Sequence, residues 1–258
     1  MASCLPRPNP SHADGTKEGK TKDESAQFIL SKNVHIPSAS RPCPESTHGK
    51  MKGDPFIEPQ MPVTGCLADN GIRQAKCLAK MLENTKIDYA FSSSYGRAIQ
   101  TAEIALEGHT ECAPIKIVKG FHEWNPSEEY RNATSTEAEA MAKRDADRDI
   151  AETWKTELGE GLFDMYARVV PAVLETLSSI GWKPTGDGFV PTEEAKDKTV
   201  AIFAHGGSLS VMLSFLLGVQ PTPMGRFCLP LTGCADIRFN ERKGIFYASL
   251  YLPLPYEE

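Results

Sequence analysis

The stretch Thr199-Val-Ala-Ile-Phe-Ala-His205-Gly206-Gly207-Ser208 decides the fold, because it joins a short apolar run to a turn containing an imidazole and two glycines. A mostly apolar segment of helical length, Leu209–Leu217, follows. This pattern is typical of an inner strand of an α/β sheet whose helix packs on one face. His205 is therefore expected at the carboxyl edge of the sheet, where ligands bind. From Gly206 onward, the helix would offer free N–H groups and a positive dipole end to an anion. The alternative is a histidine that merely caps a strand.

Composition limits the classes of protein that fit. The chain has 258 residues, of which 40% are hydrophobic, enough for one large α/β core. A net charge of −6 argues against a nucleic-acid-binding surface spread over the whole protein. The longest apolar run, Val211–Val219, falls well short of the about 18 residues that a membrane span needs. The N-terminus, Met1–Ser25, is polar and does not resemble a secretory signal, which predicts a cytoplasmic or nuclear location.

The polar and Pro-rich stretches predict the domain organisation. We expect a disordered tail over residues 1–26 and one domain over 27–258, with variable segments at 37–62 and 134–160. Within the second segment, the Ala- and Glu-rich residues 134–149 predict an exposed helical lid. The seven cysteines include no C-x-x-C pair, which favours free thiols over disulfides or a zinc site.

Hydrophobic periodicity predicts the other elements. Helices are expected at Asp69–Glu83, with a cap at Asp69-Asn70-Gly71 and Cys77 on the apolar face, at Tyr95–Leu106 and at Phe163–Leu177, with a kink at Pro171. Strands are expected at Phe28–Leu30, Tyr89–Phe91, Ile115–Val118, Ala235–Phe239 and Ile245–Leu252, and a polar loop at Pro184–Lys198.

Arg97 is a second candidate site residue, because it falls in the first turn of a predicted helix. A cation there is unfavourable beside the positive end of the helix dipole unless an anion shares the site. A solvated surface arginine is the alternative interpretation.

Four fragments must be considered together. In chain order they are Leu67-Ala-Asp-Asn-Gly71-Ile-Arg-Gln74-Ala75, Ser93-Ser-Tyr-Gly-Arg97-Ala98-Ile-Gln100-Thr101-Ala102, Phe121-His-Glu123-Trp124 and Phe203-Ala-His205-Gly206-Gly207. The set resembles the histidine phosphatase superfamily, also called phosphoglycerate mutase-like. The resemblance implies an α/β fold, a three-layer α/β/α sandwich with a mostly parallel central sheet, and a pocket at the carboxyl edge of that sheet.

The resemblance also implies roles for three residues. Arg97 would clamp a phosphate, Glu123 would protonate the leaving group, and His205 would be the second histidine of the phosphate pocket. These residue types suit the chemistry, because guanidinium and imidazole donors match the oxygens of a phosphoryl group. A carboxyl group within reach of the ester oxygen can act as a general acid.

The chain departs from the family at the end of the first strand, where the family has Arg-His-Gly. Aligning that strand puts Lys32 on the arginine, Asn33 on the nucleophilic histidine and Val34 on the glycine. An amide cannot accept a phosphoryl group as imidazole does. His35 lies two residues along and could share a strand face with Asn33. His48 keeps a following glycine but comes after a Pro-rich stretch. Lys32 and Asn33 are thus candidate phosphate-binding residues, and His35 is a candidate nucleophile.

Three functional hypotheses follow. The first is a protein that binds a small anionic, phosphorylated ligand, with phosphohistidine-dependent hydrolysis weak, lost or carried by a displaced histidine. The second is an acid–base enzyme of the dehydratase or isomerase type acting on a small acidic metabolite. The third is a non-catalytic interaction module, similar to the phosphatase-like domain of some fungal transcription factor IIIC subunits. Nothing in the sequence indicates a metal or an organic cofactor, a membrane or direct nucleic-acid binding, and a protein partner is left open.

Overall fold

The structure is a computed structural model that describes residues 27–32, 67–148, 156–186, 188–221, 226–229 and 231–251. The strands are β1 (Gln27–Lys32), β2 (Tyr89–Ser93), β3 (Lys116–Val118), β4 (Trp182–Pro184), β5 (Phe189–Pro191), β6 (Thr199–Ala204), β7 (Cys234–Arg242) and β8 (Ile245–Tyr251). The helices are α1 (Asp69–Leu82), α2 (Gly96–Ala105), α3 (Glu128–Asn132), α4 (Ser135–Ala146), α5 (Leu162–Ser179) and α6 (Gly206–Leu216), with short 3-10 turns η1 (Lys119–Phe121) and η3 (Glu193–Ala195).

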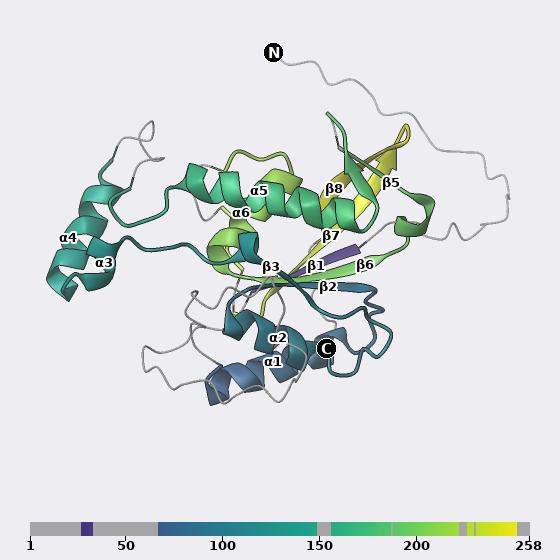
Figure 1. Ribbon diagram of the computed structural model, residues 1–258, viewed down its shortest axis with the longest axis horizontal. Helices are drawn as coiled ribbons and strands as arrows, with labels where there is room; N and C mark the ends of the chain where they lie inside the picture. Colours follow the sequence, from purple (N-terminus) through teal and green to yellow (C-terminus); the bar gives the residue numbers. More distant parts are fainter. Residues whose placement is uncertain are drawn as a thin grey trace, which may run out of the picture.

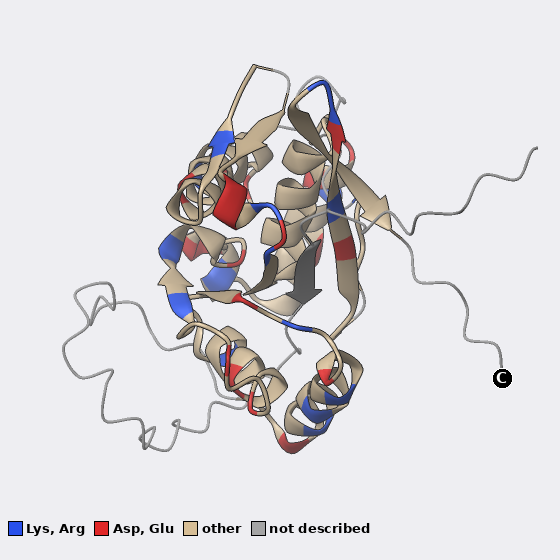
Figure 2. Ribbon diagram, turned by 90° about the vertical axis from the view of Figure 1, so that its right-hand side faces the viewer, with Lys and Arg blue, Asp and Glu red and all other residues tan. Residues whose placement is uncertain are grey.

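The described elements form three layers. Figure 1 shows α1 and α2 on one face of the sheet and α5 and α6 on the other. The predicted three-layer α/β/α sandwich is therefore confirmed. Among the described residues, no helix is both long enough and apolar enough to cross a membrane. Acidic and basic residues are interspersed over the described elements (Figure 2).

The sheet has eight strands in the order β3-β2-β6-β1-β7-β8-β5-β4. The first four run parallel, as expected, with β6 as an inner strand between β2 and β1. From β7 onward, each strand is antiparallel to its neighbour. The expected parallel arrangement thus describes one half of the sheet, because the β7–β8 and β4–β5 hairpins build the other half from local turns.

Strand β6 and helix α6 form as predicted from the stretch Thr199–Leu217. Val200 to Ala204 are all buried, and Ser208 to Ser214 of α6 are buried on every side. A strand and a helix without a polar face must lie inside the molecule. His205 is the residue between them and caps α6, with its N–H donating to Ser208 Oγ at 3.2 Å.

Helices α1 and α2 cover the other face through small and aliphatic residues. The buried residues of α1 are Gly71, Ala75, Leu78 and Leu82, and those of α2 are Gly96, Ala98, Thr101, Ala102 and Ala105. Two predictions for α1 are wrong. Cys77 is exposed, because it lies beside the apolar stripe rather than in it. The N-cap residue is Ala68, which makes no side-chain capping bond, and Asp69 already belongs to the first turn.

The antiparallel half has an aromatic core beneath α5, a helix that contains Pro171. The Trp182 ring lies 4.7 Å from that of Phe239 and 5.5 Å from that of Phe246. Trp182 belongs to β4, which pairs with β5, so the polar loop expected over 184–198 is wrong in part. Both strands have three residues and include a proline, too little for an alternating pattern to be recognised.

Helices α3 and α4 form an arm beside the layers (Figure 1). The predicted exposed helix within 134–149 is confirmed as α4, which has no buried residue. It begins with a capping box in which Thr134 Oγ1 accepts from the Glu137 N–H and the Glu137 carboxylate accepts from the Thr134 N–H. Its action as a lid stays a prediction.

Candidate functional site

Three of the predicted site residues meet at the carboxyl edge of the parallel strands. β2 ends at Ser93, and β6 ends at Ala204, directly before His205. Arg97 lies in the first turn of α2, and Glu123 follows η1. The charges of Arg97 and Glu123 interact, and so do those of Arg97 and His205. The structure therefore brings Arg97, Glu123 and His205 together around the start of α6.

The imidazole of His205 is held in a buried position. It is 2% exposed, and its Nε2 lies 2.8 Å from Ser93 Oγ. The edge of its ring meets the Tyr95 ring at a centroid distance of 5.1 Å. Burial lowers the pKa of His205 well below its ordinary value, and the positive charges of Arg97, His122 and Arg168 lower that pKa further. An anion bound beside it would favour the opposite change.

Arg97 is a half-buried cation without a counter-ion in the described part of the chain. Its guanidinium carbon lies 4.9 Å from the centre of the Tyr95 ring, a cation–π contact. The structure shows no hydrogen bond or ion pair from this guanidinium to any other described residue. Burial lowers the pKa of Arg97, while the charge of Glu123 opposes that shift. A bound anion would supply the missing partner.

The Glu123 carboxylate lies at the N-terminus of α6. Its Oε1 accepts the N–H of Gly207 at 3.0 Å and the N–H of Trp124 at 3.0 Å. A β-carbon on Gly207 would lie 2.7 Å from the same oxygen, so a larger residue here would displace the Glu123 carboxylate. The expectation that the first N–H groups of α6 are free is thus wrong at Gly207. The role expected for Gly206, the first residue of α6, stays a prediction.

Residues missed from the sequence complete the site. Tyr95 stacks on His122 at 6.0 Å, and its hydroxyl donates to Asn125 Oδ1 at 3.1 Å. Nδ1 of His122 donates to the Glu123 carbonyl oxygen at 2.8 Å. Burial lowers the pKa of His122, and this hydrogen bond opposes the shift. Ser93 and Tyr95 stand in the same sequence fragment as Arg97, and this proximity to Arg97 could have identified them as site residues.

The N-terminal candidates are placed only in part. The backbone of Lys32 ends β1 and pairs with Ala204, so β1 reaches the same edge one residue before His205. Asn33, His35 and His48 lie outside the described residues, as do the tail 1–26 and the variable segment 37–62. Their predicted roles are therefore not tested by the geometry.

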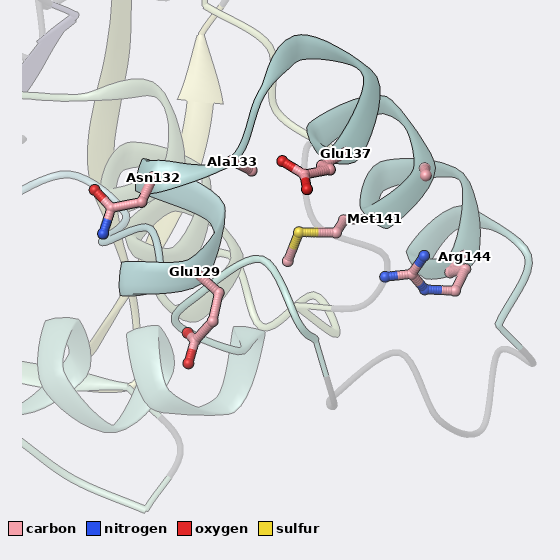
Figure 3. A pocket seen from close by; sticks show the side chains of 7 residues that line it. Glu129, Asn132, Ala133, Glu137, Met141 and Arg144 are labelled. Atoms are coloured by element: carbon pink, nitrogen blue, oxygen red, sulfur yellow. The ribbon is translucent and has the colours of Figure 1, made fainter.

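A separate pocket lies on the arm. It has a volume of about 370 Å³ between α3 and α4, and Figure 3 shows Glu129 from α3 and Glu137, Met141 and Arg144 from α4 around it. None of its lining residues belongs to the site at His205. Among the described residues, no group of three His, Cys, Asp or Glu side chains is arranged to hold a metal ion.

Known proteins resemble this chain in sequence and in fold. A profile described as the histidine phosphatase superfamily (branch 1) matches residues 61–248, a range that contains Arg97, Glu123 and His205 and begins after β1. A 2,3-bisphosphoglycerate-dependent phosphoglycerate mutase from Methanococcus vannielii is 25% identical over 206 residues, which cover 69% of this chain and 82% of that protein.

Two solved structures show the same fold. Mycobacterial hydrolase 2 has a TM-score of 0.62 and 18% identity, with 88% of this chain and 90% of that chain covered. A mycobacterial glucosyl-3-phosphoglycerate phosphatase has a TM-score of 0.58 and 18% identity, with 88% of this chain and 97% of that chain covered.

Proposed function

Because this chain belongs to the histidine phosphatase superfamily, we propose that the pocket formed by Arg97, His205 and the start of α6 binds a small phosphorylated ligand. We further propose that phosphohistidine-dependent hydrolysis is weak or lost, because our alignment of the first strand puts Asn33 at the position of the family's nucleophile. The names of the similar proteins, a phosphoglycerate mutase and a sugar-phosphoglycerate phosphatase, support a phosphorylated ligand.

The single observation that carries the proposal is the guanidinium of Arg97, which makes no hydrogen bond or ion pair with the described residues and feels only the charge of Glu123 from a distance. Removing a charge from water without a close partner is costly, so this half-buried cation is suited to bind an anion from outside. A guanidinium binds phosphate oxygens through two parallel N–H groups. The neighbouring α6 N-terminus adds a positive dipole end, where the Glu123 carboxylate already accepts the Gly207 N–H. These features together favour a phosphoryl group over a neutral ligand.

The other two residues fit supporting roles. An approaching dianion would stabilise the protonated form of His205, in which both ring nitrogens are donors. The Glu123 carboxyl group lies against the start of α6, on the loop that follows η1. It could give a proton to a leaving alkoxide. Covalent transfer, however, needs an imidazole opposite His205, and neither the amide of Asn33 nor the amine of Lys32 replaces it.

Binding is tested with inorganic phosphate by calorimetry on the full chain. We expect Arg97→Gln to weaken phosphate affinity about 10- to 100-fold, as is usual for a charge-assisted contact. Arg73→Gln is the matched control, because Arg73 is exposed and donates only to Asn70. Equal affinity in the wild type and Arg97→Gln would reject the phosphate site.

Turnover is tested with an aryl phosphate and by trapping an acid-labile phosphoenzyme. We expect little hydrolysis by the wild type and a gain in Asn33→His. Fast wild-type turnover that His35→Ala abolishes would show instead that His35 is a displaced nucleophile, and would overturn the proposed loss of hydrolysis.

The other two functional hypotheses predict different experimental results. If phosphate does not bind, stabilisation by a non-phosphorylated acid in a metabolite thermal-shift screen would favour the dehydratase or isomerase type. A stable protein complex with no metabolite response would favour the interaction module. A cytoplasmic or nuclear location is part of the proposal and is tested by cell fractionation.

A further inference from the structure

One arginine on α5 ties down the loop that carries Glu123. Nε and Nη2 of Arg168 donate to the two carboxylate oxygens of Glu160 at 2.8 and 2.7 Å. Nη1 of the same guanidinium donates to the carbonyl oxygens of Gly120 at 2.8 Å and His122 at 3.0 Å. All three nitrogens are thus used, and the two side chains are only 17% and 16% exposed. A lysine could not reproduce this planar fork.

Glu160 binds the same loop on the C-terminal side of Glu123. Its Oε2 accepts the N–H of Asn125 at 3.1 Å, and its carbonyl oxygen accepts Trp124 Nε1 at 2.8 Å. The N–H of Glu160 donates in turn to the Asn125 carbonyl oxygen at 2.9 Å. The clamp, meaning the Arg168–Glu160 pair, therefore holds the backbone at Gly120 and His122 before Glu123, and the indole of Trp124 and the backbone of Asn125 after it.

Glu123 itself makes no bond to the clamp. Its carboxylate bonds in the described residues are those from the N–H groups of Gly207 and Trp124. The position of the carboxylate thus depends on a loop whose flanking residues the clamp fixes to α5. A small displacement of this loop would move the acid away from the N-terminus of α6.

We propose that Arg168 and Glu160 are positioning residues that set Glu123 against the anion pocket, without touching the ligand themselves. The inference rests on the proposed function, since it takes Glu123 as the group that faces the ligand. By this proposal, Arg168 on α5, a helix on the face of the sheet, helps to position Glu123 at the carboxyl edge of the sheet.

Amide hydrogen exchange tests this proposal without any turnover. The Gly207 N–H lies in the first turn of α6, so its protection depends on Glu123 rather than on an intrahelical bond. We expect Arg168→Lys and Glu160→Gln to speed Gly207 exchange about tenfold or more, with Leu213 in the same helix little changed. Arg238→Lys is the control, because Arg238 forms a half-buried pair with Asp236 in the other half of the sheet. Unchanged Gly207 exchange, or an equal rise at Gly207 and Leu213, would overturn the proposal.

Leaving-group dependence gives a second, catalytic test in the wild type or in Asn33→His. An alkyl phosphate needs a proton on its leaving oxygen, whereas a nitrophenyl phosphate does not, so a misplaced acid harms the first more. We expect Arg168→Lys to lower kcat for the alkyl ester at least about tenfold more than for the aryl ester, with KM nearly constant. Equal losses on both esters would contradict a positioning role. If neither protein hydrolyses either ester, the catalytic part of the proposed function fails, and hydrogen exchange alone decides on the clamp.

Discussion

The candidate site at His205 and the α3–α4 arm use the same kinds of charged residues in opposite surroundings. At the candidate site, His205 is 2% exposed, and Arg97 is half-buried and forms no ion pair among the described residues. On the arm, Arg144 and Arg148 pair with the exposed Glu157 at 2.9 and 3.1 Å. A charge in water is screened and its pairing contributes little, whereas a charge out of water interacts strongly. Burial, rather than composition, therefore distinguishes the proposed site from the arm.

The largest effect is expected from a steric change beside the loop that carries Glu123. Gly120 packs so tightly on α5 that an added β-carbon would collide with the Ala172 side chain. We expect Gly120→Ala to lower the free energy of unfolding by about 1 to 3 kcal/mol, as overpacking does. Urea denaturation measures this. Gly108→Ala is the control, since nothing lies within 4 Å of its added β-carbon, and it should change stability by less than about 0.5 kcal/mol. Equal effects would mean that α5 and η1 move apart easily.

Acid should destabilise the pocket through its histidines. The pKa values of His205 and His122 are lowered mainly by burial, so they lie below the value of about 6.5 for an unfolded histidine. Below that pH the unfolded chain binds more protons than the folded chain. The free energy of unfolding should thus fall as the pH drops from about 6.5 through the folded pKa values. His205→Gln should flatten this slope between pH 7 and 5 in urea titrations, and an unchanged slope would show that the pKa of His205 is not lowered by folding.

A smaller contrast concerns the caps of α6 and α4. Ser208 is buried and accepts the His205 N–H, so Ser208→Ala should lower the urea midpoint, at a cost of about 1 kcal/mol. Thr134→Ala removes an exposed cap from a helix with no buried residue. It should speed amide exchange at Glu137 and leave the urea midpoint unchanged. A global loss from Thr134→Ala would show that the arm unfolds together with the sheet.

The smallest effect is expected for the ion pairs of the arm. Glu157→Gln removes the negative charge shared by Arg144 and Arg148, while Arg148 keeps its pair with Asp145. We expect a loss of less than about 1 kcal/mol that becomes smaller in 1 M salt, because pairs in contact with solvent are screened. Thermal unfolding at two salt concentrations measures it. A large loss that persists in salt would place these charges in a less solvated environment than the structure shows.

Long, strongly periodic segments could be predicted from the sequence. The apolar run before His205 and the stripes of α1 and α5 have the spacings of buried elements, and each lies close to its predicted bounds. The β4–β5 hairpin could not be predicted, because three-residue strands carry too little alternation. Cys77 shows a further limit of prediction from sequence. Neighbouring helical residues point about 100° apart, so a small error in locating the apolar face places an exposed residue in the core.

The site residues could be predicted where the neighbouring sequence forms a recognisable fragment. Arg97, Glu123 and His205 each stand in a recognisable fragment, and the structure brings them together. The clamp left no such signal. Glu160 and Arg168 are ordinary charged residues in a sequence, and the carbonyl groups that Arg168 binds belong to a loop more than 40 positions away. Contacts between side chains and distant backbone follow only from the fold.

The place of β1 has a consequence for how the chain folds. This first strand lies between β6 and β7, with Gln27 paired to both Thr199 and Arg238. The two halves of the sheet meet only through it, so the hydrogen-bonded ladder cannot close during synthesis until β7 has left the ribosome. Such distant pairing predicts slow folding and a long-lived species whose unpaired β6 edge is open to association with other chains. Deletion of residues 1–32 should therefore split the sheet and leave an aggregating protein.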